Sequence, residues 1–393
     1  MRRSVPAPAW EGSVLAVIVR PISAAEHLAY LDQRSADAGV SFLQTPAWAQ
    51  VKTEWRAESL GFFHPAAPDN SVLSGVALVL HRPVPKLKKT TLAYVPEGPV
   101  LDWVSDTTTA LTNLAAYLKK GGSFAVRIGP PVVVATWTAE QVKQGIADES
   151  IARLTDLSPS TTNAVGAKLT QQLTADGWQL QSPEDGFGAG QPQFTFEIPL
   201  ADRTEQDLLS GMNQLWRRNI KKAEKEGVVV TRAGDDAALK AFHDLYLHTA
   251  ERDHFTPRGL AYFKVMRDAM VSEGDKRFQM FLAHHEVDLV AATIYVQVGA
   301  HAWYSYGASS TEKRDVRGSN AIQWAMIRAA LEDGASVYDL RGITPTLDPE
   351  DSHVGLIQFK VGTGGQAVQY VGEWDLPLRP VIYKAFQMYL GAR

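Results

Sequence analysis

The chain has 393 residues, of which 45% are hydrophobic and 21% are charged, and its formal net charge is −4. This composition is typical of a globular protein with two or three domains, and the charge provides no overall positive field that would attract nucleic acid or anionic lipid. The absence of cysteine excludes disulfides, thiolate nucleophiles and cysteine-ligated zinc.

The sequence contains no recognisable targeting or membrane segment. The apolar run at 14–19 is too short and too interrupted for a signal peptide, and no stretch approaches the roughly 18 apolar residues of a membrane span. We therefore expect a cytoplasmic protein without an integral membrane segment, and a peripheral position at the inner face of the membrane stays open.

The first 200 residues alternate between predicted strands and helices. Residues 1–13 form an arm without predicted structure, and Thr45-Pro46 begins a helix that continues to Trp55, because proline is favoured at the first helical position. A turn at 95–102 leads into a helix that ends at 118–122. The other predictions are strands at 14–20, 72–81, 90–94, 123–128 and 194–200, a helix at 24–36, helices within 140–177 broken at 158–162, and a mobile Gly-rich loop at 183–192.

The second half repeats the order of the first. Strands at 289–298 and 302–306, a turn at 307–310, a helix at 320–333 and a strand at 336–340 follow one another, and RAALEDGASVYDLRGITP resembles AAYLKKGGSFAVRIGPP about 210 residues earlier. We interpret this as a duplicated α/β unit, although the residue-level similarity is so weak that it can also arise by chance.

The duplication predicts two domains. The first covers residues 1–200, closed by the strand at 194–200, and the second covers residues 201–365. The segment 366–393, a strand, a turn and a short amphipathic helix at 381–390, is expected to pack back on the first domain.

A basic run lies at 213–230, in NQLWRRNIKKAEKEGVVV. At 3.6 residues per turn its cations cover most of the outer face of a helix. This pattern suits contact with an RNA phosphate backbone, and it equally suits a solvated helix that Glu224 and Glu226 partly neutralise. The candidate contacts are Arg217, Arg218, Lys221 and Lys222.

The segment 249–263 places Thr256, Arg258 and Tyr262 within seven residues. A hydroxyl, a guanidinium and a phenol suit a diphosphate or a carboxylate, because arginine offers a planar bidentate fork. The alternative is a structural Arg258 that pairs with Asp253 or Glu251.

Gly318 and Ser319 precede a predicted helix, and a helix N-terminus favours anions. An acyl-CoA site would have Q/R-x-x-G-x-G/A at this position, whereas the chain has Asp315-Val-Arg-Gly-Ser-Asn320. The sequence therefore predicts a poor cradle for the CoA pyrophosphate. HExxH, Walker A and G-x-G-x-x-G motifs are absent as well.

Lys360 is a single cation in the Gly-rich segment GLIQFKVGTGG. A fixed ammonium can stabilise the negative charge that develops on a carbonyl oxygen during acyl transfer, although most lysines in such segments are simply exposed. Asp102 and Asp339 end strand-like segments and are candidate bases or orienting groups. Tyr304 and Tyr306 can stack on a ligand or serve only as sheet residues.

Seven motifs in one order resemble the Fem family (FemABX) of peptidoglycan-bridge aminoacyltransferases. They are FLQTPAWAQVK, YVPEGPVLD, RRNIKKAEKEGV, TAERDHFTPRGLAYF, YSYGASS, YDLRGITP and GLIQFKVGTGG, and they extend from about Phe42 to Leu378. The resemblance implies a mixed α/β fold with two acetyltransferase-like (GNAT) domains and a cleft between them. The resemblance is to the compact type of the family, because residues 262–281 leave no room for the coiled-coil arm that some members carry.

The resemblance also implies an activity in cell-wall biogenesis, and hence in cell shape. An amino acid would pass from aminoacyl-tRNA, the co-substrate, to the side-chain amine of the third stem-peptide residue of UDP-MurNAc-pentapeptide or lipid II. No cofactor, metal or DNA is implied. The chain would be an EC 2.3.2-class transferase.

Individual residues carry over with the motifs. The resemblance implies that Lys52, Thr256, Arg258 and Tyr262, joined by Tyr304 or Tyr306, hold the diphosphate and sugar end of the precursor. It implies that Lys360 faces the acyl ester as the catalytic cation and that Asp102 lines the cleft. Two alternatives remain: a GNAT-type N-acyltransferase that uses acyl-CoA, and a non-catalytic module that binds wall precursors or RNA.

Overall fold

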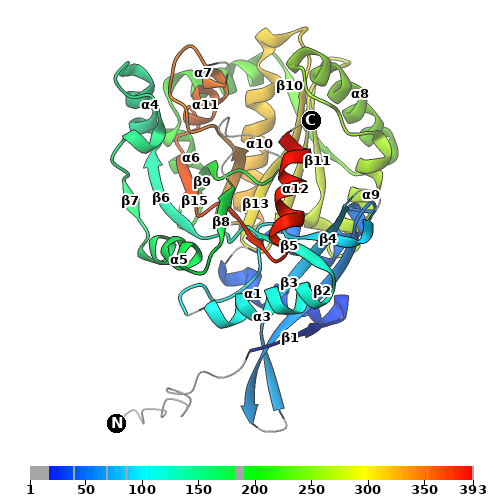
Figure 1. Cartoon of the computed structure of the whole chain (residues 1–393). Helices are drawn as coiled ribbons and strands as arrows, with labels where there is room; N and C mark the ends of the chain where they lie inside the picture. Colours follow the sequence, from blue (N-terminus) through cyan, green and yellow to red (C-terminus); the bar gives the residue numbers. More distant parts are fainter. Residues whose placement is uncertain are drawn as a thin grey trace, which may run out of the picture.

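A computed structural model describes residues 17–391, apart from 39, 68–69, 85–86, 106, 182–189 and 352. The predicted arm at 1–13 and most of the predicted loop at 183–192 lie outside these residues. Within them the chain forms two mixed sheets that helices cover (Figure 1). No helix of the described part is long and apolar enough to cross a membrane.

Sheet 1 has seven strands in the order β1-β2-β3-β4-β5-β16-β8. They are β1 (Ile18–Pro21), β2 (Arg56–Ala67), β3 (Asn70–Val84), β4 (Leu87–Val95), β5 (Ser123–Ile128), β16 (Glu373–Pro377) and β8 (Gln179–Gln181). Only the neighbours β4 and β5 run parallel among the described pairs, and α3 (Thr108–Lys120) connects them.

Sheet 2 has nine strands in the order β10-β11-β12-β13-β14-β9-β15-β6-β7. They are β10 (Val228–Ala233), β11 (Gln279–His285), β12 (Asp288–Val298), β13 (His301–Ser309), β14 (Val337–Gly342), β9 (Phe194–Pro199), β15 (Gln366–Tyr370), β6 (Val133–Thr138) and β7 (Thr161–Thr162). Again one described pair is parallel, β13 with β14, and α10 (Gly318–Glu332) connects these two strands.

The predicted repeat is therefore present in the topology. A hairpin, a helix and a parallel strand follow one another as β3-β4-α3-β5 in sheet 1 and as β12-β13-α10-β14 in sheet 2. This is a mixed α/β fold with two similarly built halves.

The two sheets exchange strands. β6, β7 and β9 precede residue 200 but belong to sheet 2, and β15 joins them there, whereas β16 returns to sheet 1. The prediction that 194–200 closes the first unit is wrong, because β9 pairs with β14 and β15. The sheets thus do not coincide with the ranges 1–200 and 201–365. Within 366–393, only β16 and the C-terminal helix pack on sheet 1.

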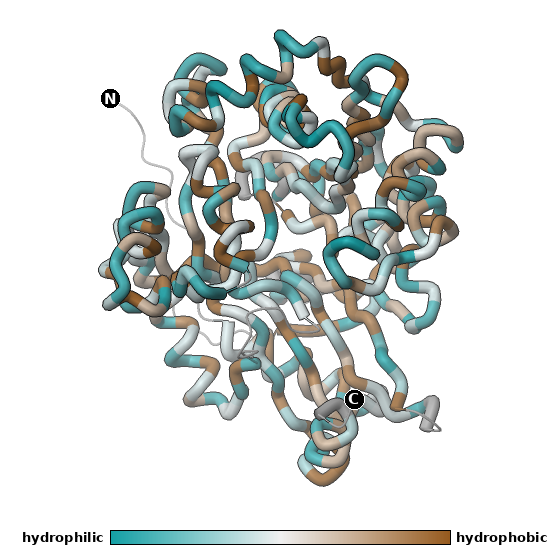
Figure 2. The backbone as a smooth tube through the Cα atoms, turned by 90° about the horizontal axis from the view of Figure 1, so that it is seen from above, coloured by the Kyte–Doolittle hydropathy of each residue, from teal (hydrophilic) through white to brown (hydrophobic). Residues whose placement is uncertain are grey.

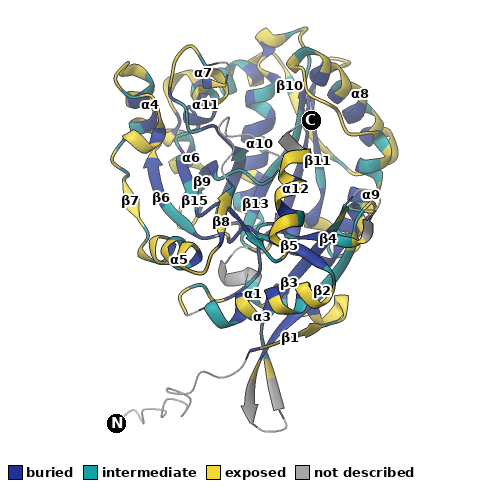
Figure 3. Cartoon of the chain, viewed as in Figure 1, coloured by how far each residue is buried: buried dark blue, intermediate teal, exposed yellow. Residues whose placement is uncertain are grey.

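The remaining helices cover the faces and edges of the sheets (Figure 3). They are α1 (Ala24–Ala38), α2 (Pro46–Val51), α4 (Ala139–Ala147), α5 (Ala164–Ala175), α6 (Glu205–Gly211), α7 (Gln214–Lys225), α8 (Asp236–Asp253), α9 (Leu260–Val271), α11 (Val354–Val361) and α12 (Pro380–Gly391). The described residues also include four short 3-10 helices: η1 (Phe42–Gln44), η2 (Leu154–Asp156), η3 (Asp275–Arg277) and η4 (Arg314–Val316).

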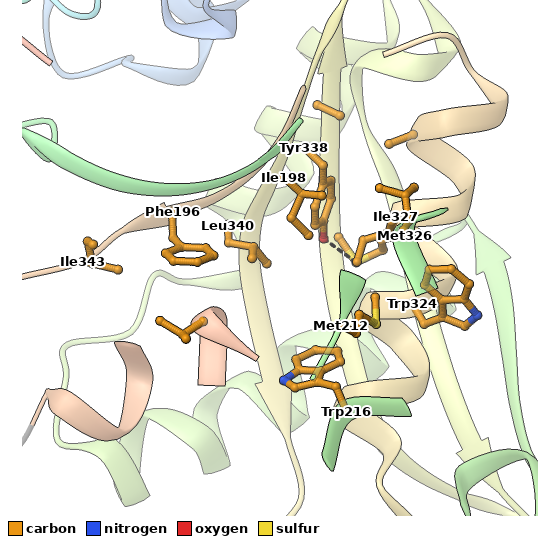
Figure 4. Close-up of a cluster of buried hydrophobic side chains, with 14 of the residues drawn as sticks. Phe196, Ile198, Met212, Trp216, Trp324, Met326, Ile327, Tyr338, Leu340 and Ile343 are labelled. Atoms are coloured by element: carbon orange, nitrogen blue, oxygen red, sulfur yellow. Dashed lines mark hydrogen bonds between the residues drawn. The ribbon is translucent and has the colours of Figure 1, made fainter. Parts of the chain in front are cut away.

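One hydrophobic core joins the two halves of the molecule. Leu78 and Trp48 from the first half pack in the same cluster as Phe263 and Trp303 from the second. A separate core between α10 and sheet 2 contains Tyr338, whose hydroxyl lies near Met326 Sδ (Figure 4). Apolar and polar residues alternate along the outer helices (Figure 2), as expected for helices that bury one face.

Two departures from the predicted elements affect the site. α2 ends at Val51 rather than Trp55, and Lys52 is its C-cap residue with a non-helical backbone. The unpredicted strand β2 follows, because residues 56–67 pair with β3 along their length. In addition, Lys360 of the Gly-rich segment lies in the last turn of a short helix, α11, that the sequence analysis does not predict.

Candidate functional site

A cluster of cations and aromatic rings joins the two halves of the chain. Lys52 Nζ lies 5.5 Å from the ring centroid of Trp48 and 5.9 Å from that of Tyr262, and the guanidinium carbon of Arg258 lies 5.2 Å from the Tyr262 ring. The hydroxyls of Tyr262 and Tyr306 are 3.2 Å apart. The structure thus brings together four of the residues predicted to bind the precursor, from α2, α9, β13 and the loop before α9.

Within the part of the chain that the structure describes, these two cations have no salt-bridge partner. Among the described residues, neither Lys52 nor Arg258 has a carboxylate within 4.0 Å. Asp253, the alternative partner of Arg258, is bound by Arg252 at 2.7 Å instead. Burial and the charge of Arg258 lower the pKa of Lys52, against the opposing effect of Glu54. Two neighbouring positive charges without a counterion favour an anionic ligand.

Tyr304 and Tyr306 have different surroundings because β13 is irregular between them. The register with β12 shifts at Ile294 and Tyr295, which pair with Tyr306 and Tyr304. Tyr306 packs in the core that joins the two halves, and Tyr304 packs against the core under α10. Burial raises the pKa of Tyr304 to about 12. Of the two tyrosines, Tyr306 is therefore the one that contacts the cation cluster.

Thr256 and Asp102 lie at the surface. Thr256 is exposed in the loop before α9. Asp102 is exposed in the turn after β4, where its carboxylate accepts hydrogen bonds from the Val104 amide at 3.2 Å and the Ser105 hydroxyl at 2.9 Å. Those contacts are typical of a turn residue, and the predicted role of Asp102 in the cleft stays a prediction.

Lys360 is 4% exposed, which differs from an ordinary surface lysine. Its Nζ donates hydrogen bonds to the carbonyl oxygens of Gly342 at 2.7 Å and Arg341 at 3.1 Å, both at the end of β14. Burial lowers the pKa of Lys360 to about 7, while the charge of Asp339 opposes this shift and that of Arg341 adds to it. A group that titrates near neutral pH is suited to catalysis.

The carbonyls that bind Lys360 are held by a network of charges. Arg341 has a left-handed backbone with φ of 64°, and its amide donates to Asp339 Oδ1 at 2.5 Å. Its guanidinium reaches Glu97 Oε1 of sheet 1's β4–α3 connection at 3.1 Å, and Ser41 donates to the other oxygen of Glu97. The network links the position of Lys360 to both sheets.

A cavity of about 240 Å³ adjoins this network. Its wall includes four carboxylates, Glu97, Glu197, Asp339 and Glu373. Burial and the charge of Asp339 raise the pKa of Glu197, which accepts hydrogen bonds from Thr195 and Tyr370. For Asp339, burial is outweighed by His301 and Arg341, so its pKa is lowered.

A second cavity of about 440 Å³ lies between α7, α11 and the start of α10. Trp216 of α7 and Phe359 of α11 contact each other there with ring centroids 4.8 Å apart. The wall also carries four cations, Arg252, Lys313, Arg314 and Arg317. Because Phe359 precedes Lys360 on α11, one short helix connects this cavity to the buried ammonium.

The basic residues of α7 are not equivalent. Asn213 caps the helix by accepting a hydrogen bond from the Trp216 amide at 2.8 Å. Arg217 donates to the backbone carbonyls of Ser210 and Met212, at the end of α6. Arg218 and Lys221 are exposed and Lys222 is half-buried, so these three are available to a ligand and Arg217 is committed to the fold.

Sequence reasoning missed part of the site. Glu97 and Arg341 lie inside the motifs YVPEGPVLD and YDLRGITP, but neither motif reveals that the two side chains meet. Trp48 lies four residues before Lys52, and an aromatic residue at that helical spacing before a cation is a usable signal for a cation–π contact.

The sequence model of the FemAB family matches residues 22–284 and 272–390. The chain is 25% identical to the lipid II:glycine glycyltransferase of Staphylococcus aureus (strain MRSA252), with 88% of this chain and 90% of that protein covered, and the same figures hold for strain USA300. The crystal structure of FemX is similar with a TM-score of 0.75 and 25% identity, over 93% of this chain and 99% of that one. A tandem GNAT protein of clavulanic acid biosynthesis, at 13% identity and a TM-score of 0.51, shares the fold over 92% of this chain and 98% of its own.

Proposed function

The chain belongs to the FemAB family and is an aminoacyltransferase, and we propose that it transfers an amino acid from aminoacyl-tRNA to the side-chain amine of the third stem-peptide residue of a peptidoglycan precursor. The two halves of the fold correspond to two GNAT-like units, in agreement with the expected architecture. The tRNA donor, the acceptor amine and the site residues are the parts of this proposal that experiment has to test.

The observation that carries the proposal is the pair of cations at Lys52 and Arg258, which lack carboxylate partners among the described residues and are flanked by Tyr262. A diphosphate has the charge that such a pair requires, and arginine binds it bidentately. The relative from Staphylococcus aureus is named for lipid II. We assign this cluster to the diphosphate and sugar end of the acceptor.

The cavity between α7 and α10 suits the other substrate. Of its cations, Arg314 and Arg317 have no carboxylate within 4.0 Å among the described residues and can contact phosphates, whereas Lys313 is paired with Glu286 and Asp288 and Arg252 with Asp253. Trp216 and Phe359 offer aromatic faces on which bases stack. Arg218, Lys221 and Lys222 extend the positive surface along α7. We assign this cavity to the single-stranded acceptor end of the tRNA, with the ester directed along α11 toward Lys360.

The reaction forms one bond and breaks one. The neutral acceptor amine attacks the ester carbonyl, a C–N bond forms, and the carbonyl oxygen becomes an oxyanion. When the C–O bond to the tRNA ribose breaks, the ribose oxygen takes up a proton and the attacking nitrogen loses one. The protonated Lys360 would stabilise the oxyanion, a contribution worth about 10²–10³ in rate for one donor.

Purified protein, charged tRNA and a precursor test the proposal directly. Glycyl-, alanyl- and seryl-tRNA are each offered with UDP-MurNAc-pentapeptide and with lipid II, and the products are identified by mass spectrometry. The expected product carries one added aminoacyl group on the third stem residue. Acyl-CoA replaces the charged tRNA in a parallel reaction: transfer from acyl-CoA and not from tRNA would contradict the proposal, and so would the absence of any product.

Lys360→Met in the same assay tests the catalytic residue. Methionine has similar volume but no charge, so we expect a loss of roughly 10²–10³ in rate with the circular dichroism spectrum retained. A folded K360M protein with full activity would remove Lys360 from the mechanism.

A further inference from the structure

Two segments without any acidic residue meet on one face of sheet 1. Residues 70–96 and 376–393 contain no aspartate or glutamate, although the chain as a whole carries a net charge of −4. Among the described side chains, the basic residues of these two segments are Arg82, Lys89, Arg379 and Lys384. The segments meet because Tyr383 and Phe386 of α12 pack on Leu92 and Phe124 of β4 and β5. Figure 1 shows α12 beside these strands.

The outward face of α12 exposes apolar side chains, in addition to those that its inward face buries. Val381 is 85% exposed and Met388 is 69% exposed, and these residues are seven apart, so they lie on the same side of the helix. Lys384 and Ala385, between them, are also exposed, and Figure 3 shows exposed residues along α12. A helix that is apolar on both sides is expected to be covered on both sides, and the described residues cover only one.

The surroundings of this face are positive. The guanidinium carbon of Arg82 lies 5.6 Å from the Phe386 ring centroid, and Arg379 and Lys89 are exposed at the end of the sheet where α12 begins. The acidic residue that precedes the segment, Asp375, is 1% exposed and is bound by Arg127 at 2.7 Å. It therefore does not neutralise the surface.

The same surface continues into the cluster that we assign to the diphosphate. Arg82 lies 5.9 Å from the Trp55 ring centroid, and Lys52 Nζ lies 6.0 Å from the same centroid. A row of alternating cations and rings therefore leads from α12 to Lys52. In a lipid-linked precursor the diphosphate is also the group that joins the headgroup to the lipid.

We propose that α12 and the adjoining basic residues Arg82, Lys89, Arg379 and Lys384 form a docking surface for an anionic lipid bilayer. Val381 and Met388 enter the boundary between headgroups and acyl chains, and the cations contact lipid phosphates. This arrangement presents the Lys52–Arg258 cluster to a precursor whose diphosphate lies at the bilayer surface. The docking itself is independent of the proposed reaction, whereas its link to a lipid-linked acceptor rests on the proposed function.

Other occupants fit less well. An RNA backbone would match the cations but would leave Val381 and Met388 in water. A second copy of the chain docked through the same face would place like charges opposite each other, which is destabilising. The bilayer satisfies both the charge and the apolar residues.

Vesicle flotation of the full chain tests the inference. The wild-type protein is expected to float with vesicles of phosphatidylglycerol and phosphatidylcholine and not with phosphatidylcholine alone, and 0.5 M salt should weaken the binding. Val381→Asp combined with Met388→Asp, and separately Arg379→Glu combined with Lys384→Glu, should each reduce binding on the order of tenfold or more. Matched controls are Val287→Asp, at a valine that is 90% exposed in the β11–β12 turn, and Lys168→Glu, at an exposed lysine of α5; both should bind as wild type.

Three results would overturn the inference: no flotation of the wild-type protein, flotation that the α12 variants retain, or loss of tRNA binding instead of vesicle binding in those variants. Light scattering must also show the same mass for wild type and variants, because a change would indicate a contact between copies. In the transfer assay the α12 variants should keep the rate with UDP-MurNAc-pentapeptide and lose about tenfold with vesicle-bound lipid II. If the wild type transfers to neither acceptor, the proposed function fails, and flotation alone decides the docking surface.

Discussion

Lys360 combines two properties that oppose each other, burial and charge. Its ammonium is removed from water, which disfavours the protonated form, while two backbone carbonyls accept its hydrogen bonds and Asp339 lies close enough to favour that form. The outcome is a lysine with a pKa of about 7. Its protonation therefore changes near neutral pH.

This pKa predicts the shape of the pH–rate profile. The acceptor amine has a pKa near 10.4 and must lose its proton, so the logarithm of the rate should rise with pH. Lys360 is protonated below about pH 7 and neutral above it, so the rise should level off above pH 7. In Lys360→Arg the guanidinium stays charged, and the rate should continue to rise. Single-turnover rates between pH 6 and 9 measure both profiles, and a wild-type slope that is unchanged across pH 7 would contradict the assignment.

Arg258 is predicted to act in binding and not in the chemical step. Arg258→Ala removes one of the two cations of the cluster, so KM for the acceptor should rise about tenfold or more with kcat nearly unchanged. Arg258→Lys should recover only part of the loss, because lysine lacks the bidentate fork. Lys264→Ala, in the adjacent helix α9 at a lysine that is paired with Asp236, is the control. Equal losses in kcat and kcat/KM would place Arg258 in the transition state instead.

At the scale of the elements, small irregularities determine which side chains meet. The register shift in β13 separates Tyr304 from Tyr306, although two residues apart in a regular strand would share a face. The early end of α2 leaves Lys52 at the C-cap, where its side chain reaches Trp48, Trp55 and Tyr262. Neither irregularity has a strong local signal in the sequence.

At the same scale, the basic residues of α7 are predicted to contact the tRNA. Arg218→Glu combined with Lys222→Glu should weaken binding of the tRNA about tenfold or more and lower the slope of log Kd against log salt by about one to two. Arg217→Ala should mainly reduce stability, by about 1–2 kcal/mol, because it leaves carbonyls at the end of α6 without a partner. Filter binding at several salt concentrations and urea unfolding separate these effects. Equal tRNA affinity for wild type and the double variant would remove α7 from the proposed contact surface.

At the scale of the whole molecule, the exchange of strands makes the two halves dependent on each other. β15 lies between β9 and β6 in sheet 2, and β16 lies between β5 and β8 in sheet 1. The core that contains Trp48 and Phe263 adds side chains from both halves. We therefore expect one cooperative unit rather than two independent domains.

Truncation tests this dependence. A chain that ends at Gly365 lacks the inner strands β15 and β16, and it should show neither a cooperative thermal transition nor dispersed amide resonances, as should the fragments 1–200 and 201–365. A chain that ends at Leu378 keeps both strands and loses only α12, so it should retain a cooperative transition at a lower Tm. Cooperative folding of the fragment 201–365 by itself would show that sheet 2 does not require β9 and β15.

The sequence by itself determined the order of the repeated unit, most helices and several strands, and the residues of the cation cluster, because these follow from local periodicity, turn residues and motifs that a family shares. Only the tertiary structure decided that β9 belongs to sheet 2, that Tyr306 and not Tyr304 contacts Tyr262, and that Arg341 meets Glu97 beside Lys360. Strand pairing joins residues far apart in the chain, and the pKa of a lysine depends on how deeply the fold buries it and on which charges surround it. Neither the pairing of strands nor the surroundings of a buried lysine can be read from the local pattern of the sequence.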